Sequence, residues 1–265
     1  MNLFKREFKA NLKALIIWTI SSAALCYMSY WEYGLSDSAD QMSDLFAGFP
    51  PIINTVFGVS PLGVNDIVGY SALIIYYIYF IGLIYALITG SKMIQKELDD
   101  QTSEFLFTKP ITRKSVLLYK TVVAKINFAI FILANFLITI QMMTNIGDST
   151  YSNEEIIKYM ALTFFGLYIL MLVTYMITIA ASVFFTDKRF SMIAGGMFIM
   201  YSYASSIVIL SFEKLNDLTI LSPWRYFATD IVVNEGFSAV YLLICIIISI
   251  GFYLVANKSI QTKMM

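Results

Sequence analysis

The sequence predicts an all-α integral membrane protein with six transmembrane helices, an N-terminal amphipathic interfacial helix and a short cytoplasmic coupling helix. Of its 265 residues, 58% are hydrophobic and only 14% are charged, and the mean hydropathy is +0.72. A soluble domain usually carries about 25% charged residues, so this chain has too little polar surface to fold in water. A bilayer must therefore solvate much of its surface.

Six stretches are apolar enough to cross a bilayer, which takes about 20 residues of helix. None of them contains Lys, Arg, Asp or Glu. The predicted spans are Ala14–Trp31, Tyr70–Ser91, Ile126–Met143, Tyr159–Phe185, Phe190–Ser211 and Ala239–Asn257. The runs are continuous rather than alternating, which favours helices over the strands of a β-barrel. We therefore expect residues 1–265 to form one transmembrane domain.

The basic residues orient the predicted bundle. With six spans both termini lie on the same side, and that side holds fifteen of the eighteen Lys and Arg residues. The opposite side holds Lys158, Lys214 and Arg225, together with twelve of the eighteen acidic residues. Since Lys and Arg gather in cytoplasmic loops, we expect a multi-pass protein of the cell membrane with both termini in the cytoplasm.

The first thirteen residues predict a helix that lies on the inner leaflet. Phe4, Phe8 and Leu12 recur every four residues and share one face. Basic residues occupy the other faces, namely Lys5, Arg6, Lys9 and Lys13. The alternative is a frayed basic terminus that only fixes the topology.

Two loops on the other side of the membrane are unusually apolar. We expect residues 45–58 to lie against the outer interface or to cap the bundle. The loop 212–238 contains Trp224, Arg225 and Tyr226, residue types that suit the headgroup layer, and it has room for two short interfacial or re-entrant helices. Its role is either anchoring or a part in gating and cargo exit.

The long connection between the second and third spans, residues 92–125, predicts a cytoplasmic helix–turn–helix. Thr102 or Ser103 can cap a short helix, and Pro110 ends it. Thr112 can then cap a second helix that runs into the third span. The short helix carries an apolar knob, made by Phe105, Leu106 and Phe107. Such a knob on a solvated face indicates a protein partner.

This connection resembles the cytoplasmic loop of ABC-2-type transporter permeases. In that family an acidic residue is followed by Gly-Thr, a second acidic residue and large apolar residues, then by Pro, Ser or Thr, Arg and a later Lys. The matching residues here are Glu97, Thr102, Glu104, Leu106, Pro110, Thr112, Arg113 and Lys120. Gln101 stands where the family usually has glycine, so we expect a tighter helical turn there.

The resemblance implies the ABC-2, or type V exporter, fold. It also implies a permease dimer, of identical or paralogous chains, that binds two copies of an ATPase subunit. The ATP and Mg²⁺ would belong to that ATPase, because no G-x-x-x-x-G-K-[ST] motif occurs in this chain, and we expect no catalytic residues here. The implied docking residues are Glu97, Gln101, Thr102, Glu104, Phe105, Leu106, Phe107, Pro110 and Arg113.

The resemblance also implies a mechanism and a cargo class. Closure of the ATPases on ATP would push the docking helix and switch the bundle between inward- and outward-open states. The interfacial residues beside it would feel the same push, namely Phe4, Lys5, Arg6, Phe8 and Lys9. The most similar branch is the Gram-positive type that exports peptide toxins and antimicrobial peptides, so we expect a bacterial exporter of an amphipathic or hydrophobic peptide or drug.

Adaptable side chains within the spans are candidates for the cargo path. They are Tyr76, Tyr79, Met171 and Met197, since Tyr and Met surfaces accommodate varied apolar ligands. The alternative is ordinary packing or contact with lipid. No metal site is expected, because the chain has no histidine and only two cysteines. Its balanced charge offers no basic face for nucleic acid.

Three other functions are weaker alternatives. An intramembrane enzyme would need a carboxylate, His or Lys at membrane depth, and the predicted spans contain none. A secondary transporter often has spans broken by Pro or Gly, and no proline lies in any predicted span. An immunity or sensor subunit that works with an ABC ATPase remains open.

Overall fold

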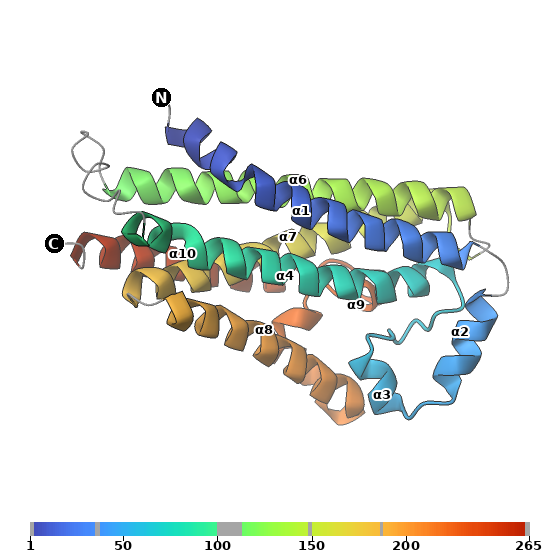
Figure 1. The fold of residues 1–265 in the computed structure, drawn as a ribbon. Helices are drawn as coiled ribbons and strands as arrows, with labels where there is room; N and C mark the ends of the chain where they lie inside the picture. The colour runs from blue at the N-terminus through green and yellow to red at the C-terminus, as the bar shows by residue number, and fades with distance from the viewer. Residues whose placement is uncertain (1–2, 35–37, 100–112, 148–149, 186–187, 263–265) are drawn as a thin grey trace.

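Six long helices form the body of the molecule in this computed structural model, which describes residues 3–34, 38–99, 113–147, 150–185 and 188–262. They are α1 (Leu3–Tyr33), α4 (Ile67–Asp99), α6 (Arg113–Ile146), α7 (Asn153–Phe184), α8 (Lys188–Ser211) and α10 (Ala239–Thr262). Each contains a stretch that is long and apolar enough to span a membrane, so the prediction of six spans is confirmed. Both termini lie at one end of the bundle, here called the terminal end, and the opposite end is called the distal end (Figure 1).

Helix α7 is the centre of the bundle. It packs against α4, α6, α8 and α10 and is the most deeply buried of the six. It begins with a capping box, in which Ser152 and Glu155 each bond the other's backbone N–H. Because α7 is apolar on all sides, it can be surrounded by other helices, whereas α1 and α10 leave most of their surface for lipid or a partner.

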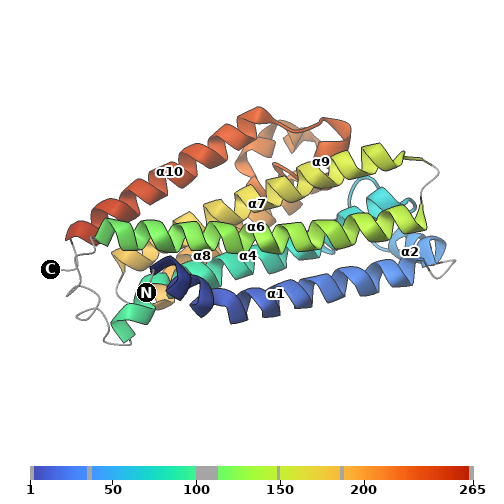
Figure 2. The same ribbon diagram turned by 90° about the horizontal axis from the view of Figure 1, so that it is seen from above.

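The predicted interfacial segment and the first span form one helix, α1, which bends near its N-terminus (Figure 2). Its main partner is α6. Two polar contacts join this pair. The side chains of Cys26 and Thr139 lie 3.2 Å apart, and those of Glu7 and Lys120 lie 3.4 Å apart. In both contacts the second residue follows the first by 113 positions in the sequence. The two helices thus run parallel in one register. Helix α6 begins at Arg113, as expected for a helix that leads into the third span.

The connection from α1 to α4 contains two short helices, α2 (Ser38–Ala47) and α3 (Pro51–Val56), which lie at the distal end (Figure 1). Pro51 is the first residue of α3, where its missing N–H costs nothing. Helix α3 packs against α8, so the apolar segment after the first span caps the distal end of the bundle, one of the two expected placements.

The connection from α8 to α10 enters the bundle from the distal end. It consists of η1 (Glu213–Leu221), η2 (Pro223–Arg225) and α9 (Thr229–Asn234). η1 packs along α8, and α9 contacts α7 and α4. The Phe227 carbonyl accepts a hydrogen bond from Tyr79 at 2.8 Å. Tyr79 is about three turns into α4, roughly 18 Å from its distal end. The re-entrant alternative for this loop is therefore the correct one.

Irregular backbone at membrane depth must find hydrogen-bond partners inside the protein. Side chains of this segment and of the neighbouring helices supply several of them. Ser222 donates to the Ser202 carbonyl of α8 at 3.1 Å, and the Tyr226 hydroxyl donates to the Ile220 carbonyl. We call residues 222–234 the re-entrant segment.

Small residues on α7 and α8 permit this close packing. A Cβ atom at Gly166 would lie 2.1 Å from Cβ of Phe227, so only glycine leaves room for the re-entrant segment against α7. On α8, Ser202 and Ser206 are buried within the bundle. These hydroxyl-bearing residues therefore serve packing within the chain.

We predict that Gly166→Ala displaces Phe227 and lowers the melting temperature of the detergent-purified protein. Overpacking typically costs about 1–3 kcal/mol, which corresponds to a fall of several degrees. Gly196→Ala is the matched control, because a Cβ there would meet nothing within 4 Å, and alanine favours helix over glycine. Equal melting temperatures for the two variants would contradict the described seating of Phe227.

Candidate functional site

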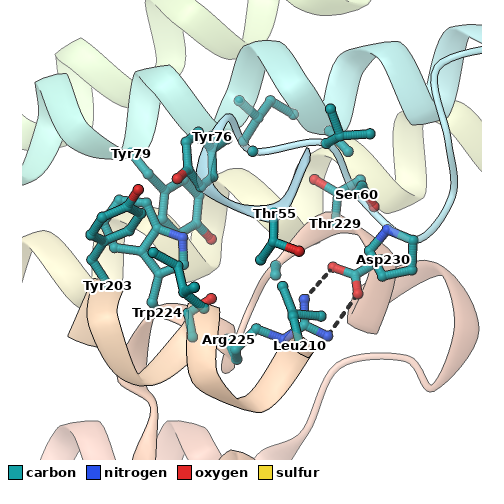
Figure 3. Close-up of a pocket in the computed structure, with 18 residues that line it drawn as sticks. Thr55, Ser60, Tyr76, Tyr79, Tyr203, Leu210, Trp224, Arg225, Thr229 and Asp230 are labelled. Carbon is teal, nitrogen blue, oxygen red and sulfur yellow. Dashed lines mark hydrogen bonds and ion pairs between the residues drawn. The ribbon is translucent and has the colours of Figure 1, made fainter. Parts of the chain in front are cut away.

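A cavity lies at the distal end where the re-entrant segment meets α4 and α8 (Figure 3). Its empty volume is about 520 Å³, including space open to solvent. The residues that line it come from four parts of the chain: Thr55, Gly58, Val59, Ser60 and Pro61 of the α3–α4 connection; Ala72, Ile75, Tyr76 and Tyr79 of α4; Tyr203, Ser206, Ile207 and Leu210 of α8; and Trp224, Arg225, Ala228, Thr229 and Asp230 of the re-entrant segment.

One side of the cavity is an aromatic cluster centred on Trp224. Its ring centroid lies 4.5 Å from that of Phe80 and 5.7 Å from that of Tyr203. Tyr76 and Tyr79 are 5.5 and 5.7 Å away, in the tilted or edge-on arrangements that aromatic pairs prefer. Helices α4 and α8 and the re-entrant segment thus share one set of rings.

The residues 55–61, here called the strap, cover the cavity and are held by tyrosine hydroxyl groups. Tyr76 and Tyr203 both donate to the Val56 carbonyl, at 2.9 and 3.0 Å, and Tyr77 donates to the Phe57 carbonyl at 3.0 Å. Gly58 follows with φ of +85°, a conformation that favours glycine. A movement of α4 relative to α8 would therefore disturb the strap.

The other side of the cavity contains a buried ion pair. Arg225 donates to both carboxylate oxygens of Asp230, from Nη1 at 2.9 Å and from Nη2 at 2.7 Å. The two residues are 7% and 5% exposed, and Nε of Arg225 has no hydrogen-bond partner among the described residues. The bidentate geometry is the strong form of this interaction.

This position of Arg225 corrects the expectation for the headgroup layer. Trp224, Arg225 and Tyr226 are all buried within the bundle, so they do not face lipid as interfacial anchors would. Residue type alone suggested anchoring. The available sequence signal for the pairing of Arg225 with Asp230 was that these two opposite charges lie only five positions apart in the same loop.

A second ion pair lies at the terminal end. Nζ of Lys120 is 3.4 Å from Oε2 of Glu7, and Arg6 contacts the other oxygen of Glu7 at 2.9 Å. Lys120 and Glu7 are both buried. The pair joins the first turns of α1 to α6. Sequence reasoning singled out Lys120 and Arg6 but missed Glu7, the residue that connects them.

The predicted interfacial residues lie around this pair. Lys5 and Lys9 are exposed, and Phe4, Arg6 and Phe8 are half-buried. The rings of Phe4 and Phe8 stack 6.2 Å apart. Glu7 thus lies on the face of α1 that packs on the bundle. The predicted apolar face, formed by Phe4 and Phe8, is less buried than Glu7.

The predicted docking residues lie largely outside the described residues. Those concerned are Gln101, Thr102, Glu104, Phe105, Leu106, Phe107 and Pro110. Glu97 belongs to the last turns of α4 and Arg113 begins α6. The role of this segment therefore stays a prediction.

The predicted cargo-path residues separate into three environments. Tyr76 and Tyr79 both line the distal cavity. Met171 is buried inside the bundle, and Met197 is 67% exposed on α8. The structure thus brings the two tyrosines together with Tyr203 and Trp224, which sequence reasoning did not select, and leaves the two methionines apart from them.

No cluster of three or more acidic or cysteine side chains that could hold a metal ion occurs within the part of the chain that the structure describes. A family model described as ABC-2 family transporter protein matches residues 1–260. A search of the curated proteins finds no significant match to the chain.

We predict that Asp230→Asn destabilises the protein, because it leaves the buried charge of Arg225 without its partner. Removing one member of a buried pair costs about 3–5 kcal/mol, so the melting temperature in detergent should fall by roughly 10 °C. Asp217→Asn is the control, since Asp217 is exposed in the same connection.

The double variant Arg225→Met with Asp230→Met separates loss of the pair from a stranded charge. It should recover most of the stability, because apolar replacements of a buried pair are often neutral. An Asp230→Asn protein as stable as the control would show that the pair is not buried as described.

Proposed function

Because the chain belongs to the ABC-2 family of transporter proteins, we propose that it is the membrane permease subunit of an ATP-driven exporter whose ATPase is a separate polypeptide. The chain contains no P-loop motif, so the energy of ATP must reach it through contact with another protein. Two permease copies and two ATPase subunits would form the working complex.

The observation that best supports this proposal is the match of the ABC-2 family model to residues 1–260. The buried contact between Glu7 and Lys120 supplies a route by which the ATPase would act on the bundle. Helix α6 begins immediately after residues 100–112, the segment for which we predict ATPase docking. A force applied to that segment would pass directly into the first turns of α6. The ion pair would carry it on to α1, because breaking a buried pair is costly.

The charge distribution supports the proposed orientation of the complex in the membrane. Lys and Arg gather on the terminal side of the spans, which the positive-inside rule places in the cytoplasm. The proposed ATPase would therefore act at the terminal end, and the distal cavity would lie toward the outside. An amphipathic or hydrophobic cargo fits this arrangement, because the described parts of the six spans offer it apolar and aromatic surface.

We predict that replacing Phe105, Leu106 and Phe107 together by Ala abolishes co-purification of the partner ATPase. The change removes the apolar anchors of the proposed contact, and interface anchors of this kind commonly contribute about 2 kcal/mol or more each. The measurement is ATP hydrolysis recovered with the tagged permease from cells that express both chains.

The matched control replaces three exposed apolar residues at the distal end, Leu45, Phe49 and Ile52, by Ala. That variant should retain the ATPase, because the proposed contact lies at the other end of the molecule. Loss of hydrolysis from both variants alike, or from neither, would refute the docking assignment.

We further predict that Lys120→Met separates ATPase binding from conformational coupling. The ATPase should still co-purify, but the change in permease tryptophan fluorescence on trapping the complex with ATP and vanadate should be lost. Lys125→Met is the control, since Lys125 is exposed on the same helix. A normal fluorescence response from the Lys120→Met complex would mean that the Glu7 contact carries no force.

A further inference from the structure

We infer that the distal cavity binds an uncharged, apolar segment of peptide, namely one or two aliphatic or aromatic side chains with the backbone amide that carries them. This inference rests on the proposed export of an amphipathic cargo, and it specifies the chemistry that the outer half of the bundle would recognise. Three features of the cavity support it: its aromatic wall, its charge balance and one unused hydrogen-bond donor.

The wall of the cavity suits a small apolar group. Trp224, Tyr76 and Tyr203 present ring surface, and Ile75, Ile207 and Leu210 present aliphatic surface. Such walls gain most from apolar side chains, through buried area and ring contacts.

The charge balance of the cavity disfavours a charged ligand. Arg225 and Asp230 are the charged residues that line it, and they neutralise each other through two short hydrogen bonds. An incoming carboxylate or ammonium group would have to break this pair or remain without a counter-ion in a desolvated site. A peptide terminus is therefore a poor occupant, whereas an internal peptide unit brings no charge.

The unused donor points to a carbonyl group. Nε of Arg225 is buried and has no hydrogen-bond partner within the described chain, although buried donors are almost always paired. A peptide carbonyl would accept from this N–H without disturbing the two bonds to Asp230. The hydroxyl-bearing residues Ser206 and Thr229 line the same cavity and are available for the peptide N–H.

The same features favour a peptide over the acyl chain of a lipid. An acyl chain would fill the apolar volume but would offer Arg225 no acceptor at that depth. Lipid occupancy is therefore the outcome that the experiment must distinguish.

The test uses Trp224 as a reporter. The chain has three tryptophans, so Trp18→Phe with Trp31→Phe leaves Trp224 alone in the full-length protein. This protein, in phosphatidylglycerol nanodiscs without ATPase, is titrated with acetyl-Leu-Phe-amide. We expect a saturable change in Trp224 emission. The free acid acetyl-Leu-Phe and the amine Leu-Phe-amide should bind about tenfold or more weakly, because each adds one charge.

Two variants on α8 show whether the probe occupies the cavity. Ser206→Phe fills it, since Ser206 is buried in its wall, and should abolish the response. Ser205→Phe is the matched control, because this neighbouring residue does not line the cavity, and it should leave the titration unchanged. Both variants are checked for an unaltered melting temperature, and Arg225→Lys, which removes Nε, should weaken binding if the protein remains folded.

Three results would overturn the inference: no saturable change with the amide, equal binding of the charged analogues, or an undiminished response from Ser206→Phe. Strong quenching of Trp224 by brominated phosphatidylglycerol in place of any response to the amide would show that lipid occupies the cavity. Since no ATPase is present, failure here leaves the proposed docking intact, and failure of docking leaves this binding measurable.

Discussion

The structure depends on one constraint: a loop that enters a membrane bundle must have its polar backbone groups bonded within the protein. The re-entrant segment meets this demand with partners from neighbouring helices. Tyr79 bonds the Phe227 carbonyl and Ser222 bonds the Ser202 carbonyl, while Gly166 provides the space that Phe227 occupies. The position of Trp224, and with it the aromatic wall of the cavity, follows from this seating.

Two buried ion pairs stand at opposite ends of the bundle and have different consequences. Arg225 and Asp230 lie five residues apart and fix the shape of one short segment. Glu7 and Lys120 join two helices that are far apart in the sequence, so this pair can transmit movement between them. Between the two ends runs α7, which touches four of the other long helices. In the proposed exporter, a displacement at the terminal end would reach the distal cavity through these packed helices.

The sequence was sufficient to predict the six spans, because uncharged runs about 20 residues long have few other interpretations. It was insufficient for the charges that the bundle buries. Hydropathy treats Glu7, Lys120 and Arg225 as surface residues, since it contains no information about partners. The contact of Glu7 with Lys120 depends on the register of α1 against α6, which a single sequence does not reveal. Tyr76 and Tyr79 were selected for their residue type, but Trp224 and Tyr203 join them only through the re-entrant path of the chain.

The most direct test of this account is hydrogen–deuterium exchange of the full-length protein in nanodiscs, followed by mass spectrometry of peptides from residues 222–234. A segment seated inside the bundle should exchange as slowly as the neighbouring peptides of α7, because its backbone is bonded and shielded from water. The peptides of α2 should exchange rapidly and provide the internal reference. Exchange of residues 222–234 at the rate of α2 would contradict the account, since it would place the segment at the surface.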